Sequence, residues 1–245
     1  MINENKKLVA EVKPEGDGAR VKRLFPTSEF SHLDPFVLLD EFSVQAPNKF
    51  STHEHRGFEA VTYMLSGSFV HKDNLGNESK VTAGGIQSFN AGRGIKHSEA
   101  PGEEEGHSHG IQLWVNLPRE EKQSEPGYCK IPASEVPEQE AENLKIRTVA
   151  GPGAKLNLQA DIIFQDVEIK QETSYNIQLD SRNQAVIYVV EGKIAAGEKL
   201  QAGEGYLLAP ESELTVKGIS SSSRFIFLTG KPLQQEIEIQ GSFVK

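Results

Sequence analysis

The sequence predicts an all-β protein made of two stacked β-barrels, with few and short helices. Three observations favour this fold class: strand signals dominate, helical periodicity is weak, and one β-pattern occurs twice. The chain has 245 residues, which is enough for one large all-β domain or two small ones. The 22 glycines indicate frequent turns between short strands.

Alternating β-branched and aromatic residues mark the strands along the chain. They form AVTYMLSGSFVHKD (Ala60–Asp73), IQLWVNL (Ile111–Leu117) and RFIFLTG (Arg224–Gly230). A helix is expected in only one segment, Ala133–Asn143, where Pro137 limits its length.

The duplicated pattern has two parts, and both recur in the same order. VTYMLSGSFV (Val61–Val70) resembles VIYVVEGKIA (Val186–Ala195), with a shared Tyr-x-x-x-Gly. VTAGGIQSFNAG (Val81–Gly92) resembles LQAGEGYLLAPE (Leu200–Glu211), with a shorter loop before the second copy. Two related β-units that follow each other are typical of a duplicated small barrel.

A proline-rich segment separates the two copies. It runs from residue 118 to about residue 140, and its composition indicates a linker or crossover between the barrels. We therefore expect an N-terminal metal-binding domain over residues 1–125 and a C-terminal domain without a metal site over residues 126–245.

The histidines are confined to the first copy, which indicates a duplication in which one site was lost. All seven lie within the first 109 residues: His32, His53, His55, His71, His97, His107 and His109.

Composition excludes several classes of function. The net charge of −9, without a Lys/Arg cluster, argues against direct binding of nucleic acid. The single cysteine, Cys129, excludes an internal disulfide and a thiolate zinc site. The polar start and the short apolar runs give no signal for secretion or for membrane insertion, so a cytoplasmic protein is expected.

Two pairs of residues have the spacing of metal ligands on strands. Side chains at positions i and i+2 of a strand face the same way, so His53 and His55 project together, as do His97 and Glu99. Three imidazoles and one carboxylate suit a divalent first-row metal and leave coordination positions open for reactants. A hydrogen-bonded polar cluster without metal remains the alternative interpretation.

The run HEHRGFEAVTYMLSG…AGRGIKHSEAPG…GIQLWVNLP resembles the pirin family of the cupin superfamily, and HLDPFVLLDEF (His32–Phe42) resembles the segment before it. The resemblance implies two cupin-type barrels and iron bound by His53, His55, His97 and Glu99. Fe(II) is the implied metal, and Mn, Co, Ni, Cu and Zn suit the same ligands. Pirins usually have proline where this chain has Glu54, which points away from the expected metal on a strand.

The resemblance also implies a function. Several pirins oxygenate flavonols, so we expect a quercetin 2,3-dioxygenase activity that takes a flavonol-like substrate and O2 and releases carbon monoxide. Glu99 would be both a metal ligand and the catalytic base for the substrate hydroxyl. The alternative is an iron-dependent regulatory module that binds a protein partner.

Other candidate residues rank lower. Glu59 matches the acidic position of the general cupin motif and is an alternative ligand. His109 is expected near the pocket and His107 in an exposed loop, whereas His32 and His71 are expected to be structural or surface residues. An oxoglutarate-type iron triad starting at His97 would need a distal histidine, and none follows His109. Four aromatic residues are expected in the core and as pocket walls: Phe42, Phe50, Phe89 and Trp114.

Overall fold

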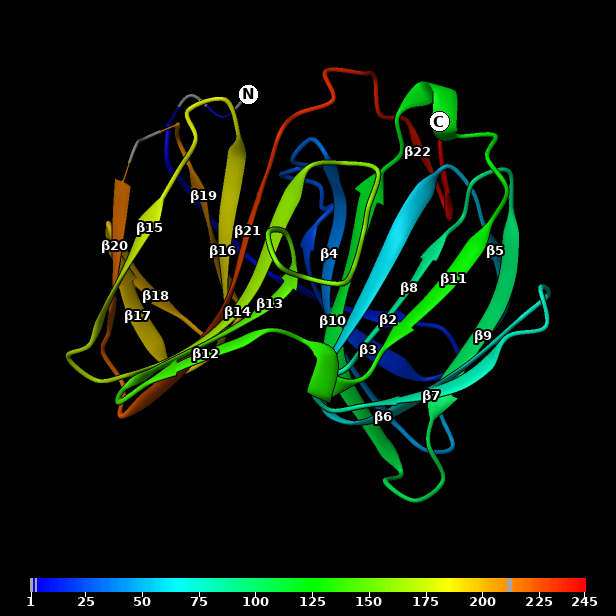
Figure 1. Cartoon of the computed structure of the whole chain (residues 1–245), viewed down its shortest axis with the longest axis horizontal. Coiled ribbons are helices and arrows are strands. Elements are labelled where there is room, and N and C mark those ends of the chain that lie inside the picture. Colours follow the sequence, from blue (N-terminus) through cyan, green and yellow to red (C-terminus); the bar gives the residue numbers. More distant parts are fainter. Residues whose placement is uncertain (1, 3, 211–212) are drawn as a thin grey trace. The chain divides into compact units, whose positions relative to one another are not determined.

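The computed structural model describes residues 2, 4–210 and 213–245. Met1, Asn3 and Glu211, which ends the second copy of the repeat, lie outside the described residues. Nearly all regular structure is β, which confirms the all-β class with two curled, barrel-like units (Figure 1).

The two compact units differ in their bounds from the expected domains. Residues Glu11–Val136 and Leu233–Lys245 form one unit, which we call the histidine unit because it holds every histidine. The described residues up to Ala10, together with Pro137–Pro232, form the other, which we call the apolar unit. The division into domains at residue 125 stays a prediction, and each unit is described separately below.

The histidine unit contains a large antiparallel sheet in the order β11-β8-β6-β10-β4-β3-β2, with β5, β7 and β9 paired beside β6. The long strand β6 pairs with β8 and β10 in its first half and with β7 and β9 in its second half. Its strands are β2 Glu11–Glu15, β3 Ala19–Phe25, β4 Phe36–Gln45, β5 Phe50–His55, β6 Phe58–Asp73, β7 Glu78–Thr82, β8 Ile86–Asn90, β9 Ile95–Pro101, β10 His107–Asn116, β11 Gly127–Ile131, β22 Ile239–Gln240 and β23 Phe243–Val244.

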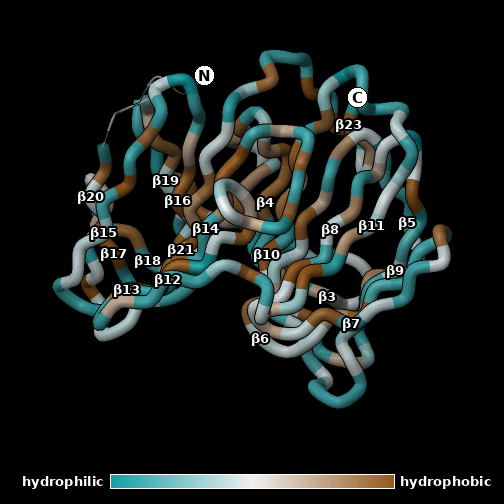
Figure 2. Tube along the Cα trace, in the orientation of Figure 1, coloured by the Kyte–Doolittle hydropathy of each residue, from teal (hydrophilic) through white to brown (hydrophobic). Residues whose placement is uncertain are grey.

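The apolar unit repeats this plan with a sheet in the order β1-β19-β16-β21-β14-β13-β12 and a second sheet in the order β15-β20-β17-β18. Its strands are β1 Lys6–Val9, β12 Glu138–Ala141, β13 Leu144–Ala150, β14 Ile162–Lys170, β15 Ser174–Gln178, β16 Gln184–Glu191, β17 Lys193–Ala196, β18 Glu198–Gln201, β19 Glu204–Leu208, β20 Glu213–Gly218 and β21 Ser222–Gly230. Figure 2 shows hydrophobic residues along its inner strands and hydrophilic residues in the connecting turns. Aliphatic and aromatic side chains fill its interior.

The sequence repeat corresponds to a structural repeat. Tyr63 on β6 and Tyr188 on β16 are both fully buried, at 0% and 1% exposure. Gly67 and Gly192 follow them, both with positive φ, and a Cβ at either position would collide with a backbone carbonyl of the neighbouring segment. Glycine is therefore required at this bend in both units because the close approach leaves no room for a side chain.

The helix expected in the segment between the copies does not form. Ala133–Glu135 forms only a 3₁₀ turn, and Glu138–Ala141 is strand β12, paired with β13. Pro137 interrupts any helix at this point, and pairing with β13 stabilises the extended backbone that follows. The other 3₁₀ turn is Arg119–Glu121, and no helix among the described residues is long and apolar enough to cross a membrane.

Candidate metal centre

Strands β5 and β9 pair so that three histidines meet at one point. His53 lies directly opposite His97 in the register of the two strands, and His55 shares the face of His53 because it lies two residues further on. The Nε2 atoms of His53 and His97 are 3.1 Å apart, and the ring centroid of His55 lies 4.5 Å from that of His53 and 4.9 Å from that of His97. His53, His55 and His97 therefore form one compact group, the histidine cluster, with a ligand atom of each within 4.8 Å of the others.

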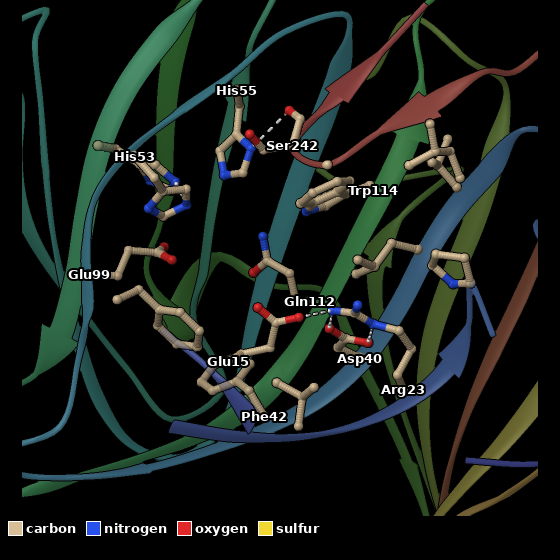
Figure 3. A pocket seen from close by; sticks show the side chains of 18 of the residues that line it. Glu15, Arg23, Asp40, Phe42, His53, His55, Glu99, Gln112, Trp114 and Ser242 are labelled. Carbon is tan, nitrogen blue, oxygen red and sulfur yellow. Dashed lines mark hydrogen bonds and ion pairs between the residues drawn. The ribbon is translucent and has the colours of Figure 1, made fainter. Parts of the chain in front are cut away.

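Hydrogen bonds on the far side of each ring fix the tautomers. His53 Nδ1 lies 2.7 Å from the carbonyl oxygen of Ser51, and His55 Nδ1 lies 3.3 Å from that of Ser242, as Figure 3 shows for His55. A carbonyl only accepts, so both Nδ1 atoms carry the proton and both Nε2 atoms keep a free lone pair.

The third tautomer follows from a chain of contacts behind His97. Asp73 accepts the backbone N–H groups of Leu75 and Asn77. Burial would raise the pKa of its carboxyl, but the hydrogen bonds from His71, Asn77 and Leu75 outweigh it and lower the pKa. His71 therefore donates from Nε2 to Asp73 over 3.0 Å, which leaves His71 Nδ1 as the acceptor for His97 Nδ1 at 3.3 Å. His97 thus also presents an unprotonated Nε2 to the cluster.

The electrostatics of the cluster fit a cation. Burial, followed by the neighbouring His53, lowers the pKa of His55 to about 3. Burial and the surrounding histidines lower the pKa of His97 well below its usual value. The three neutral imidazoles point lone pairs at one another with no hydrogen-bond donor between them, and such lone pairs repel one another. A divalent metal at their centre would accept all three lone pairs and so relieve the repulsion.

Glu99 belongs to a second group, which overlaps with the histidine cluster. Its ligand atoms gather with those of His71 and His97, and its Oε1 accepts a hydrogen bond from Gln87 Nε2. Burial raises the pKa of Glu99 to about 8, and only the Gln87 bond opposes this. Figure 3 shows its carboxylate in the cavity beside His53. Three of the four expected ligands, His53, His55 and His97, therefore form one group. Glu99 belongs to the second group, which has only His97 in common with the first.

A cavity of about 390 Å³ opens onto the histidine cluster and Glu99. Its walls include the aromatic rings of Phe42, Phe50, Phe69 and Trp114, and the C-terminal turn between β22 and β23 also lines it. A mostly apolar cavity of this size with a few convergent polar groups is typical of a small-molecule site.

The remaining candidate residues lie elsewhere. His107 is exposed, as expected, and His109 pairs with Glu41 over 2.9 Å and does not line the cavity. Glu59 is buried but belongs to neither group of potential ligands among the described residues. Phe42, Phe50 and Trp114 line the cavity, and Phe89 stacks against His55.

Two features were missed from sequence. His71 was expected to be structural or at the surface; it is fully buried, which excludes the surface, and its contact with His97 behind the cluster was not expected. The spacing His71-x-Asp73, which places both residues on one strand face, was the available signal. The C-terminal residues that reach His55 gave no signal in the sequence.

Comparisons with known proteins find relatives over almost the whole chain. Residues 18–115 match the family model described as Pirin, and residues 164–245 match that of the Pirin C-terminal cupin domain. A pirin-like protein of Solanum lycopersicum is 36% identical over 98% of this chain and 85% of its own length. Human pirin is 32% identical over 97% of this chain and 85% of its own length.

Among solved structures, quercetin 2,3-dioxygenase from Acinetobacter baumannii is similar to the whole chain. The match has a TM-score of 0.91 and 26% identity, and it covers 100% of this chain and 92% of that protein.

Proposed function

Because the chain belongs to the pirin family of the cupin superfamily, we propose that it is a metal-dependent dioxygenase of the quercetin 2,3-dioxygenase type. Its substrate in this proposal is a flavonol-like aromatic molecule, which is cleaved with O2 and releases carbon monoxide. The similarity to the quercetin 2,3-dioxygenase of Acinetobacter baumannii supports this choice of reaction.

The observation that carries the proposal is the convergence of three unprotonated Nε2 atoms at the wall of an aromatic cavity. His53, His55 and His97 would hold the metal from one side, and Glu99 would join them by rotating its carboxylate from Gln87 toward the cluster. When bound, the metal supplies a Lewis-acidic centre that lowers the pKa of a substrate hydroxyl and holds substrate and O2 together. Fe(II) is the proposed metal, and the same donors suit Mn, Co, Ni, Cu or Zn.

In this proposal Glu99 accepts the proton of the substrate hydroxyl, and neighbouring residues position the carboxylate and the substrate. Glu99 is 6% exposed and burial raises its pKa, so its carboxylate, ionised by a cation bound at the cluster, would have a high affinity for the proton of the substrate hydroxyl. Gln87 Nε2 donates to Glu99 Oε1 and so holds the carboxylate beside the histidine cluster before a metal binds. The rings of Phe42, Phe69 and Trp114 offer apolar contacts to a flat substrate and keep water from the reacting atoms.

Oxygen uptake tests the proposal directly. The iron-loaded protein should consume O2 when quercetin is added, and the same protein stripped of metal should not. Absence of uptake by the iron-loaded protein would refute the dioxygenase assignment.

A second candidate is an iron-dependent regulatory module that binds a protein partner. The net charge of −9 favours protein contacts over direct contact with nucleic acid. A pull-down that compares the ferrous and ferric forms tests this candidate: a partner retained by only one form supports it, and identical partners for both forms count against it.

A further inference from the structure

A row of five polar side chains crosses the main sheet of the histidine unit. Each is the cross-strand partner of the next, and cross-strand partners lie on the same face of a sheet. In order along β3, β4, β10, β6 and β8 the members are Arg23, Asp40, Gln112, Thr62 and Gln87. We call this set the polar row.

The polar row faces the cavity and links its two ends. Arg23, Asp40 and Gln112 line the cavity, and Figure 3 shows Gln112 between the histidine cluster and the Arg23–Asp40 pair. At one end Gln87 donates to Glu99. In the middle Thr62 donates to Gln112 Oε1 over 2.6 Å, which leaves the amide nitrogen of Gln112 directed toward the cluster.

The other end of the row is a charged group of three residues. Arg23 donates to both carboxylate oxygens of Asp40, at 2.9 and 2.7 Å, and to Glu15 Oε1 at 2.8 Å. Asp40 is only 4% exposed, whereas the side chain of Glu15 is 38% exposed and lies at the cavity lining.

The apolar unit shows which residues occupy the equivalent positions in the other barrel. Tyr188 matches Tyr63 in the repeat, and the register of each sheet then matches the remaining positions. The equivalent row is Thr148, Gln165, Phe227, Ile187 and Tyr206. Three of its members, Phe227, Ile187 and Tyr206, belong to the hydrophobic core of that unit.

An ion pair beside the row, unlike the row itself, occurs in both units. Glu41, next to Asp40, pairs with Lys22 at 3.0 Å, and the equivalent Asp166 pairs with Arg147 at 3.5 Å and with Arg224 at 2.7 Å. This ion pair, on the opposite face of each sheet from the row, is present in both units, so it serves the barrel itself. Among the described residues of the apolar unit the equivalent positions do not form this row, so a barrel of this kind can fold without it.

The charges at the Arg23 end select the kind of ligand. One guanidinium faces two carboxylates, and the nearby Lys13 is paired with Glu11, so this end has an excess of one negative charge and offers mainly acceptor oxygens. An anionic group would be repelled there, whereas a hydroxyl group would donate to Glu15. The aromatic walls favour a flat molecule between the two ends.

We propose that the polar row and Glu15 bind a neutral, flat aromatic molecule with several hydroxyl groups. One oxygen of the ligand lies at the histidine cluster beside Gln112, and its distant hydroxyl groups donate to the carboxylates around Arg23. This inference rests on the proposed function because it uses the same cavity, and it adds that hydroxyl groups far from the reacting oxygen determine specificity.

Binding measured without turnover tests the proposal. Trp114 is the only tryptophan of the chain and lines the cavity, so quenching of its fluorescence, corrected for absorption by the ligand, reports occupancy. The iron-loaded protein is titrated without O2 with quercetin and with 3-hydroxyflavone, which keeps the oxygens for the metal but lacks the other hydroxyl groups. Wild type should bind quercetin at least about tenfold more tightly, as expected for one hydrogen bond to a charged acceptor.

Two variants and a control complete the test. The double variant Arg23→Thr/Asp40→Gln introduces the residues of the apolar unit, and Glu15→Leu removes the accessible acceptor without emptying a buried position. Both should lose most of the preference for quercetin, whereas Lys22→Met, next to Arg23 on β3 but on the opposite face of the sheet, should keep it.

Equal binding of the two flavonols by wild type, or an unchanged preference in Glu15→Leu, would overturn the inference. A preserved preference without oxygen uptake would refute the dioxygenase proposal and leave the binding site standing.

Discussion

The Nδ1 atoms of His97 and His71 lie 3.3 Å apart, and Nε2 of His71 donates to Asp73 Oδ2 over 3.0 Å. The ring of His71 is fully buried and stacks on Tyr128 with centroids 4.5 Å apart. His71 therefore orients His97 without reaching the cavity, and its contribution is separable from that of the expected ligands.

Replacing His71 should weaken metal binding. His71→Phe keeps a ring against Tyr128 but removes the acceptor for His97 Nδ1. Loss of such an orienting partner typically lowers metal affinity by about 10–100-fold. Competition with a chelator measures the affinity, and His107→Ala, at an exposed histidine, is the control. An affinity in His71→Phe equal to that of the control would show that His71 only packs.

Replacing His97 should remove most of the metal. His97 belongs to both groups of potential ligands, so His97→Ala opens the histidine cluster and also separates it from Glu99. Elemental analysis of the wild type, purified without added metal, should find about one first-row metal per chain, as three imidazoles and a carboxylate hold. Unchanged metal content in the variant would contradict the ligand assignment.

Glu99→Gln should reduce turnover far more than it reduces metal binding. The amide keeps the size of the side chain and a weak oxygen ligand, so part of the metal should remain. Turnover should fall by about 10²–10⁴-fold because the amide cannot accept the substrate proton. Rates are compared at equal metal content, and a variant with wild-type turnover would exclude Glu99 as the base.

The C-terminal hairpin is held by Lys122, whose burial predicts a pH dependence of stability. Lys122 Nζ donates to the carbonyl oxygens of Gly57 and Val244 and to Asn116 Oδ1, and Val244 lies on the hairpin that supplies Ser242 to His55. Burial lowers the pKa of Lys122 from 10.5 to about 8.

The sign of the effect follows from proton binding. Between about pH 8 and 10.5 the unfolded chain keeps the proton on Lys122 and the folded chain releases it, so stability rises with pH. The free energy of unfolding of wild type relative to Lys122→Met should therefore increase over this interval and stay flat below it. Urea titrations at several pH values measure it, and a relative stability that falls over the same interval would contradict the pKa shift.

Local patterns were enough to predict the parts of the site that depend on one strand. The spacing of His53 and His55 placed both rings on one face, and the repeated tyrosine and glycine predicted two related barrels. These features depend on strand periodicity and on backbone space, which neighbouring residues determine.

Features that depend on register could not be predicted in this way. Arg23 and Gln87 belong to one row only because five strands pair in a particular register, which no single segment encodes. The approach of Ser242 to His55 joins residues 187 positions apart. Glu99 turned out to bond Gln87 because a buried carboxylate needs a donor, and periodicity gives only its face.

The most direct test of the account is the ratio of carbon monoxide released to O2 consumed when the iron-loaded protein is given quercetin. Dioxygenolytic cleavage at the histidine cluster predicts equal amounts of the two gases, and no carbon monoxide from the metal-stripped protein. O2 uptake without carbon monoxide, or no uptake, would contradict it.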